Sequence, residues 1–358
     1  MTKAHFFRLA AGIVFASTVA FSTACQGQSQ TTPSPQPSQT PAAKQQSLTV
    51  YSGRGEGLVK PIIEQFSKAT GIAVQVRYAG TSELAATILE EGKNSPADVF
   101  WAQDAGALGA LSKEGRFSTL PAVVLDKVEP RFRSPKREWV GVTGRARVVA
   151  YNASKLKPED LPDSIYGFTD PKWKGRIGWP PTNGSFQAFV TALRVLDGEA
   201  KARQWVEGVK ANGARAYGNN TAALLAVASG EVDVAFVNHY YLYAQLKTEG
   251  SSFKARNYYP RAGDAGALIN VAGVGILNSS KKQDLALRFV EFLLSPAAQS
   301  YFAGDSPQDA YEYPLVAGVP AHPELPPLSQ IKTPNIDLSN LDDLKGTLNL
   351  LRETGMVP

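Results

Sequence analysis

The sequence predicts an α/β fold of two lobes, with hinge strands between the lobes and a ligand cleft at their junction. Three observations lead to this prediction. Segments with strand-like and helix-like patterns alternate along the chain, two apolar segments are placed to cross between lobes, and polar side chains follow the predicted strands. Alternation of this kind is typical of parallel, doubly wound sheets. Ligands of such sheets bind outside the carboxyl ends of the strands, so the polar side chains predict a binding cleft.

The first residues have the pattern of a secretory signal. Lys3 and Arg8 precede an apolar stretch at residues 9–21, which is shorter than the roughly 18 residues that a membrane-spanning helix needs. We therefore expect residues 1–24 to be a signal peptide. The mature protein would then work on the outer side of the cytoplasmic membrane, in the periplasm or at the cell surface.

Cys25 is the only cysteine in the chain, so it cannot form an internal disulfide. It follows three small residues, as at a lipoprotein cleavage site, although Ser22 stands where that pattern usually has Leu. Residues 25–46 are rich in Gln, Ser, Thr and Pro, which favours a disordered linker. We expect Cys25 to carry a lipid anchor, with simple secretion as the alternative.

A strand–helix–strand–helix–strand run opens the folded body. Its first helix, at residues 58–70, carries Leu58, Ile62 and Phe66 at helical spacing, and Gly71 ends it. The same patterns predict strands at 48–51, 72–78 and 97–101 and a second helix at 82–91, which together would start a parallel sheet.

The rest of the body repeats the alternation. Two apolar strands, near residues 148–151 and 271–276, are candidates for crossing between the lobes. They give a first lobe of residues 47–148 plus 272–320 and a second lobe of residues 149–271 plus 321–358. Further strands are expected at 147–151, 176–179, 232–237 and 267–277, and further helices at 186–196, 200–210, 221–229, 285–294 and 341–354.

Tyr240 and Tyr241 follow residues 232–237, which have the pattern of a buried strand. Two phenols at such a strand end can present hard oxygen atoms, which suit a hard cation such as Fe³⁺. Aromatic packing of a loop is the plainer interpretation of two adjacent tyrosines. His239 precedes them, and in an extended segment its side chain would alternate away from Tyr240, which favours a packing role over metal ligation.

Small polar residues precede two predicted helices, at Asn183-Gly184-Ser185 and at Asn220. Free backbone N–H groups and the helix dipole at such starts favour an anion, while ordinary N-capping is the alternative. Arg54 or Arg145 could add bidentate contacts to a small oxyanion, or could be solvated surface charges.

Other function classes lack their signatures. The net charge is +5 and no run of Lys and Arg is present, so the sequence does not support nucleic-acid binding. The Gly-x-Ser-x-Gly elbow, the His-Glu-x-x-His zinc motif and the phosphate-binding Gly-Lys-Ser/Thr loop are all missing. We therefore expect a monomeric binding protein and not an enzyme.

Five stretches of the body together resemble the ferric-iron-binding proteins of bacterial ABC importers. The resemblance implies the transferrin-like, two-lobed periplasmic-binding-protein fold. It also implies capture of Fe³⁺ with a synergistic anion such as carbonate, and delivery to an ABC transporter permease in the inner membrane. The five stretches are Val50 to Arg54, Pro96-Ala97-Asp98-Val99-Phe100, Arg147 to Asn152, Pro181 to Phe186 and Asn238 to Tyr241.

The resemblance also implies site residues. In that family two adjacent tyrosines coordinate iron, which points to Tyr240 and Tyr241, and in one branch a third tyrosine, in the position resembling Tyr151, completes the set. This sequence has Gly55 and Gln103 where the best-known branch has a histidine and a glutamate, so the resemblance favours the three-tyrosine branch. The resemblance also places anion-holding segments at Asn183-Gly184-Ser185, Asn220 and Asn238. With Ser52, Arg54 and Arg145 added, these are the predicted anion-binding residues.

Two other functions stay open on the sequence alone. One is a binding protein for a small organic or oxyanion ligand, such as a polyamine or sulfate, which would lack the tyrosine-to-metal charge-transfer colour of an iron site. The other is a secreted α/β hydrolase, which metal-independent turnover of a substrate would support.

Overall fold

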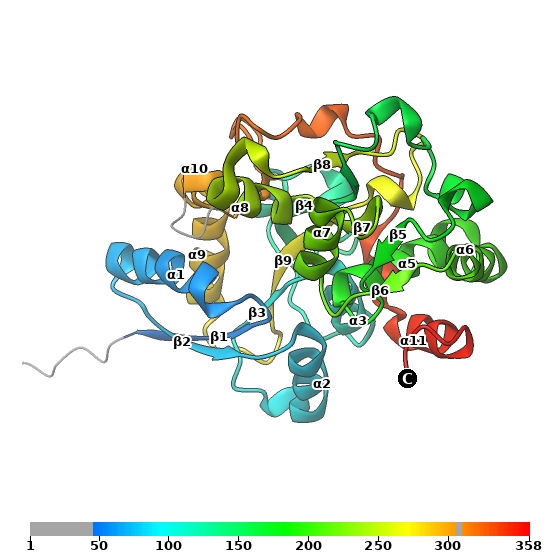
Figure 1. Ribbon diagram of the computed structural model, residues 1–358. Coiled ribbons are helices and arrows are strands. Elements are labelled where there is room, and N and C mark those ends of the chain that lie inside the picture. Colours follow the sequence, from blue (N-terminus) through cyan, green and yellow to red (C-terminus); the bar gives the residue numbers. More distant parts are fainter. Residues whose placement is uncertain (1–45, 306–309) are drawn as a thin grey trace, which may run out of the picture. The chain divides into compact units, whose positions relative to one another are not determined.

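The computed structural model describes residues 46–305 and 310–358 (Figure 1). The predicted signal peptide at residues 1–24, the predicted lipid anchor at Cys25 and the predicted linker as far as residue 45 lie outside the described residues. Within the part of the chain that is described, no helix is long and apolar enough to cross a membrane.

A first group of strands contains the predicted opening of the body. Strand β1 (Ser47–Ser52) lies between β2 (Ala73–Tyr78) and β3 (Val99–Ala102) and pairs with both in parallel. Helix α1 (Glu56–Thr70) ends at Gly71, whose φ of 73° is the left-handed conformation that glycine adopts without strain. The predicted parallel start is therefore confirmed. The other helices of this part of the molecule are α2 (Thr81–Glu91), α3 (Ala105–Lys113), α4 (Ala122–Leu125), α9 (Gln283–Leu293) and α10 (Pro296–Ser300).

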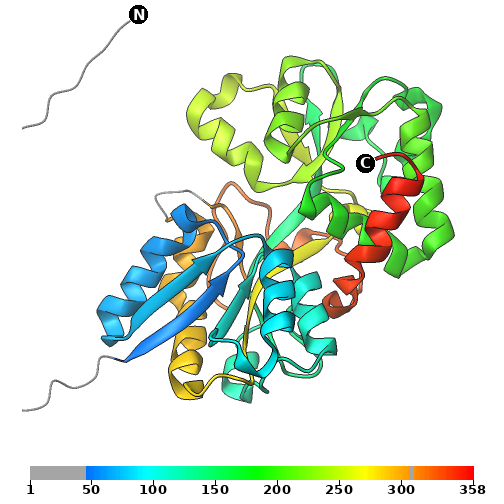
Figure 2. The same ribbon diagram turned by 90° about the horizontal axis from the view of Figure 1, so that it is seen from below.

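The long strand β4 (Val140–Asn152) joins this group to a second one, and all 13 of its residues are buried. Its first half pairs with β9 (Ile269–Ile276), which inserts between β3 and β4 and runs antiparallel to both. From Arg147 onward β4 pairs instead with β7 (Val234–Asn238). Between Ala146 and Arg147 the chain therefore passes from one strand group to the other, as Figure 2 shows for the strand between the blue and green parts.

The second group is built around β7. Strand β5 (Ile177–Trp179) pairs in parallel with β7 and with β6 (Arg215–Ala216), and β8 (Ala255–Tyr258) pairs with β4. The predicted α/β fold with two lobes is confirmed, and β4 is a strand with partners in both groups, whereas among the described strands β9 pairs only with β3 and the first half of β4. The sheet is mixed, because β4 and β9 run antiparallel to their neighbours. The domain bounds given above stay a prediction. The helices of this group are α5 (Gly184–Asp197), α6 (Glu199–Ala211), α7 (Asn220–Ser229) and α8 (Tyr240–Glu249).

The C-terminal segment contacts helices of both groups. Its 3₁₀ helix η10 (Leu338–Asp342) lies against α3 so closely that a Cβ on Gly106 would be 2.4 Å from the Leu341 carbonyl oxygen. The side chain of Asp342 pairs with Lys113 of α3 at 2.5 Å. A residue larger than glycine at Gly106 would push this segment off the helix.

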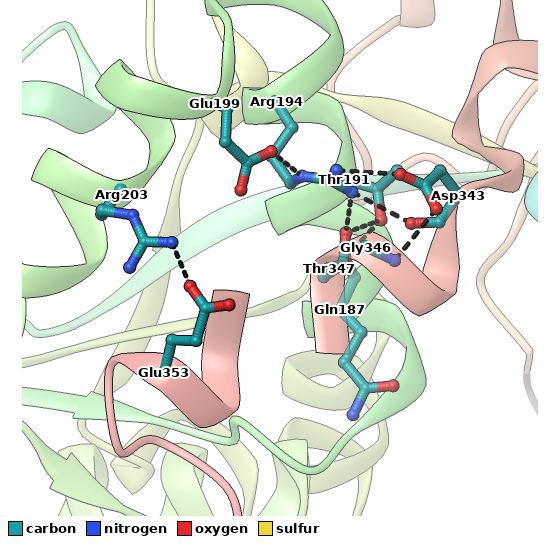
Figure 3. A network of polar contacts seen from close by, with 9 residues as sticks. All are labelled: Gln187, Thr191, Arg194, Glu199, Arg203, Asp343, Gly346, Thr347 and Glu353. Carbon is teal, nitrogen blue, oxygen red and sulfur yellow. Dashed lines mark hydrogen bonds and ion pairs between the residues drawn. The ribbon is translucent and has the colours of Figure 1, made fainter. Parts of the chain in front are cut away.

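The next residue, Asp343, contacts a helix of the second strand group. Its carboxylate pairs with Arg194 of α5 at 2.8 Å, and helix α11 (Leu344–Glu353) then runs beside α5 and α6 (Figures 1 and 3). The hydroxyls of Thr191 and Thr347 are 2.7 Å apart, and Thr347 also accepts a hydrogen bond from Arg194 at 3.0 Å. Neighbouring carboxylates, Asp342 and Asp343, thus hold one segment to helices of two strand groups.

Candidate anion and metal site

The tyrosine pair begins helix α8, directly after strand β7. Tyr240 and Tyr241 are half-buried, and their ring centroids lie 4.3 Å apart at an angle of 32°. His239 has helical backbone angles (φ −60°, ψ −40°), so the predicted extended segment, with His239 alternating away from Tyr240, is wrong. The imidazole is nevertheless fully buried and bonded on both nitrogens, to the backbone of Ala146 and Tyr311. It is therefore a packing residue with no lone pair left for a metal.

The environment of Tyr240 opposes ionisation of the free phenol. Burial raises the pKa of Tyr240 above its ordinary value, and the charge of Tyr241 and a side-chain hydrogen bond with it raise this pKa further. The charge of Arg145 lowers the pKa of Tyr240, and the charge of Glu312 raises it. Without a metal, Tyr240 is therefore protonated at neutral pH.

Arg147 lies beside the pair, and it is not among the predicted site residues. It is 3% exposed, and it donates to the Phe236 carbonyl at 2.7 Å, to Asn238 Oδ1 at 3.3 Å and to Ser185 Oγ at 3.4 Å. Burial lowers the pKa of Arg147 to about 9, against the opposing effect of Tyr241 and Tyr240. The spacing of two residues from Arg145 would have indicated it, because side chains at i and i+2 of a strand share a face.

A hydrogen-bonded cluster joins Arg147 to the starts of two helices. Asn183 caps α5 and accepts from the Ser185 N–H at 3.0 Å, from the Ser185 hydroxyl at 2.6 Å and from Asn220 Nδ2 at 3.0 Å. Asn219, the residue before Asn220, caps α7. The capping alternative therefore applies to Asn183, whereas Asn219 and not Asn220 caps α7. The same contacts bring Asn183, Ser185, Asn220 and Asn238 into one network with Arg147.

A cavity of about 280 Å³ opens next to this network. The buried Arg145 and Arg147 contribute to its wall, and the Nε atoms of both lack a partner among the described residues. Asp104 also lines it, and burial raises the pKa of that carboxyl, which Arg145 counters in part. The cavity walls thus carry buried cations and amide groups, which suit an anion. Its polar lining includes Gln103, Asp104, Arg145, Arg147, Ser185, Asn238 and Asn270.

Four predicted anion ligands, Ser52, Arg54, Asn183 and Asn220, lie outside this lining. Arg54 is buried in an ion pair with Glu312 at 2.7 Å, and the second Glu312 oxygen accepts from the Thr143 hydroxyl. Ser52 accepts from the Arg54 N–H at 3.2 Å and is fully buried. Arg54 therefore neutralises Glu312, which sequence reasoning missed. This leaves Arg145 and Arg147 as the cations of the cavity wall.

Tyr151 does not lie with Tyr240 and Tyr241 in the structure. It pairs with Val234 at the beginning of β7, whereas Arg147 pairs with Asn238 at its end. At about 3.3 Å per residue the two positions are roughly 13 Å apart along the strand. Burial raises the pKa of Tyr151, and its charged neighbours are Arg256 and Glu159. Among the described residues, no cluster of three or more His, Cys, Asp or Glu side chains could hold a metal, so Tyr240 and Tyr241 are the metal candidates.

Comparison with known proteins gives consistent matches over most of the chain. Residues 61–333 match the family model of bacterial extracellular solute-binding proteins. The chain is 36% identical over 312 residues to the major ferric iron-binding protein of Neisseria meningitidis serogroup A, covering 86% of this chain and 93% of that protein. It is 34% identical over 317 residues to the Fe(3+)-binding periplasmic protein of Serratia marcescens, covering 88% and 92%. The structure of Trichodesmium FutA in complex with iron and citrate matches with a TM-score of 0.76 at 31% identity, covering 87% of this chain and 100% of that one.

Proposed function

Because this chain belongs to the bacterial extracellular solute-binding protein family, we propose that it captures ferric iron outside the cytoplasmic membrane and delivers it to an ABC importer. Relatives over one third identical carry ferric iron in their names. The single observation in this chain that carries the proposal is the adjacent phenols of Tyr240 and Tyr241, which do not line the cavity but interact electrostatically with the buried arginines of its wall.

Tyr240 and Tyr241 bind the ion as phenolates in this proposal. Phenolate oxygen is a hard donor that suits a trivalent cation. Two phenolates balance two of the three positive charges of Fe³⁺, so a further anion is needed for a neutral buried site. Tyr151 is left out of the ligand set, because it lies at the other end of the β4–β7 ladder, where β7 begins.

The synergistic anion binds in the cavity between Arg145, Arg147 and the start of α5. The supporting observations are the two buried guanidinium groups and the backbone N–H of Gly184, which lies at the positive end of the α5 helix dipole. Carbonate fits this chemistry, and so does a larger carboxylate. A relative is known in complex with iron and citrate. The same cations could bind an oxyanion without metal, which an iron titration distinguishes.

The rest of the proposal concerns location and partners. The mature protein works as a monomer in the periplasm or at the cell surface, anchored by a lipid on Cys25, and it hands its cargo to an inner-membrane permease. It catalyses no reaction. The supporting observations are the signal pattern, the position of Cys25 in the sequence and the family's extracellular, solute-binding character.

Substitution of single tyrosines tests the site. Tyr240→Phe and Tyr241→Phe each remove one oxygen and keep the ring, so each should abolish the visible tyrosine-to-iron charge-transfer band. Each should also lower iron affinity at least about tenfold. The matched control is Tyr151→Phe, which should bind iron with the colour and affinity of the wild type. Visible spectra during titration with ferric citrate measure all three. Normal titrations of the Tyr240 and Tyr241 variants would overturn the site.

A further inference from the structure

We propose that His239 is a positioning residue for the iron ligands. Its imidazole extends the β4–β7 ladder by one hydrogen-bonded pair, although helix α8 already begins at the next residue, Tyr240. This inference rests on the proposed ferric site. Arg147 pairs with Asn238 in that ladder, so the next rung would join Ala146 to His239. In a regular antiparallel rung of this kind, the two residues exchange both N–H···O bonds.

Only half of this rung is made by the backbone. The His239 N–H donates to the Ala146 carbonyl at 3.0 Å, as in a regular ladder. The His239 carbonyl, however, turns away with the start of the helix and accepts from Asn257 Nδ2 at 2.8 Å. The Ala146 N–H instead donates to Nδ1 of the His239 ring at 3.1 Å. The side chain thus replaces the lost carbonyl, and the fully buried Ala146 keeps its hydrogen bond.

The second ring nitrogen makes a different connection. Because Nδ1 accepts, Nε2 carries the hydrogen and donates to the Tyr311 carbonyl at 2.7 Å. The neighbouring Glu312 pairs with Arg54 of the first strand group, and the imidazole also lies 4.9 Å from the Tyr313 ring. Burial lowers the pKa of His239 to about 4, which agrees with a neutral ring.

The consequence is a fixed position for the first turn of α8. Tyr240 and Tyr241 follow His239 directly, and Arg145 and Arg147 flank Ala146. One imidazole therefore ties the phenols to the strand that carries the cations of the anion site. Without it, the helix start can shift relative to that strand, and shifts of an ångström are costly in a metal site.

Three substitutions separate the two contacts. His239→Phe keeps a ring against Tyr313 and removes both hydrogen bonds. His239→Asn places an oxygen near the Nδ1 position and can keep the bond to Ala146. His239→Gln places an amide N–H near Nε2 and can keep the bond to Tyr311. The control is His322→Phe, because the His322 ring packs on Tyr311 at 4.5 Å without reaching Ala146.

The measurements are ferric citrate titration, the charge-transfer spectrum at saturating iron, and thermal unfolding of the metal-free proteins. We expect His239→Phe to lower iron affinity by about 10- to 100-fold and to shift the band, and His239→Asn to recover most of both. A purely structural role would lower the melting temperature and leave the saturated spectrum unchanged. That result, in the Phe variant or in the Gln variant if the Phe protein does not fold, would overturn the inference. Absence of iron binding by the wild type would instead overturn the proposed function.

Discussion

At the residue scale, the phenols must lose their protons before they can bind a metal. Burial and Tyr241 raise the pKa of Tyr240, so the metal-free phenol is protonated at neutral pH and the bound one is not. Iron binding therefore releases protons, and acid reverses it. We expect the affinity for iron to fall by up to about tenfold per pH unit for each phenol proton that iron binding releases. Iron titrations at several pH values measure this dependence.

The same shift has a different effect on folding. A phenol whose pKa is raised in the folded state stabilises the fold below the unfolded pKa, and that contribution is lost only as the pH rises toward the folded pKa. Tyr240 therefore gives no reason for the metal-free protein to unfold in mild acid. Circular dichroism should stay constant while iron is released, and an affinity independent of pH would contradict tyrosinate ligation.

A second prediction at this scale concerns Arg147. Arg147→Gln keeps a hydrogen-bonding side chain and removes the charge that lies between Asn238 and Ser185. We expect iron affinity in carbonate buffer to fall by about tenfold or more, since charge-assisted contacts to anions are the strong ones. In strictly anion-free buffer the variant and the wild type should differ little. The comparison Arg131→Gln changes a half-buried arginine that pairs with Glu129 and does not line the cavity, and it should leave both affinities unchanged.

Single residues also show where sequence reasoning succeeded. Asn183, Ser185, Asn220 and Asn238 were predicted from helix starts and a strand end, which are local signals, and the structure joins them in one network. Tyr151 was expected at the same edge and lies elsewhere. The reason is strand direction, because β4 runs antiparallel to β7 and brings its earlier residues to the end of β7.

At the element scale, α11 is held to α5 by buried hydroxyl groups. Thr347 is fully buried and contacts both Thr191 and Arg194 (Figure 3). Thr347→Val keeps the shape and removes these bonds, so we expect a loss of about 1 kcal/mol in the free energy of unfolding, measured with urea. The matched control is Thr354→Val in the same segment, whose hydroxyl bonds only to carbonyls of its own helix.

A double variant completes this test. The pair Thr191→Val and Thr347→Val should cost less together than the sum of the single losses, because residues in direct contact are not independent. Strict additivity would show that the two hydroxyls do not interact in solution.

The elements themselves were predicted more fully than the site. Helix α1, helix α5 and the parallel start of the sheet follow from apolar spacing and glycine ends, which are properties of short segments. The length of β4 was underestimated, because its first half, Val140 to Ala146, contains two glycines and an arginine, which weaken the strand pattern. The helical start at His239 was also missed, because it depends on a contact with Ala146 far away in the sequence.

At the scale of the whole molecule, the C-terminal segment was predicted as a helix after an irregular stretch, with no indication of what it contacts. Its carboxylates at Asp342 and Asp343 reach Lys113 and Arg194, which lie in different strand groups. Charges far apart in sequence give no local pattern, so such pairings are found only once the chain is folded. The alternation of strands and helices, by contrast, was sufficient for the fold class.

The insertion of β9 between β3 and β4 has a consequence for the order of assembly. A chain that emerges from its N-terminus presents β3 and β4 long before residues 269–276 arrive to pair with both. Until then, two buried strands have open edges, which are templates for aggregation. The long sequence separation of these partners also slows folding, because distant pairs pay a larger loop-closure entropy. The first strand group begins the chain but is therefore completed only after the second group has been made. A chain that crosses a membrane unfolded has to keep the open edges of β3 and β4 apart until about three quarters of its length is through.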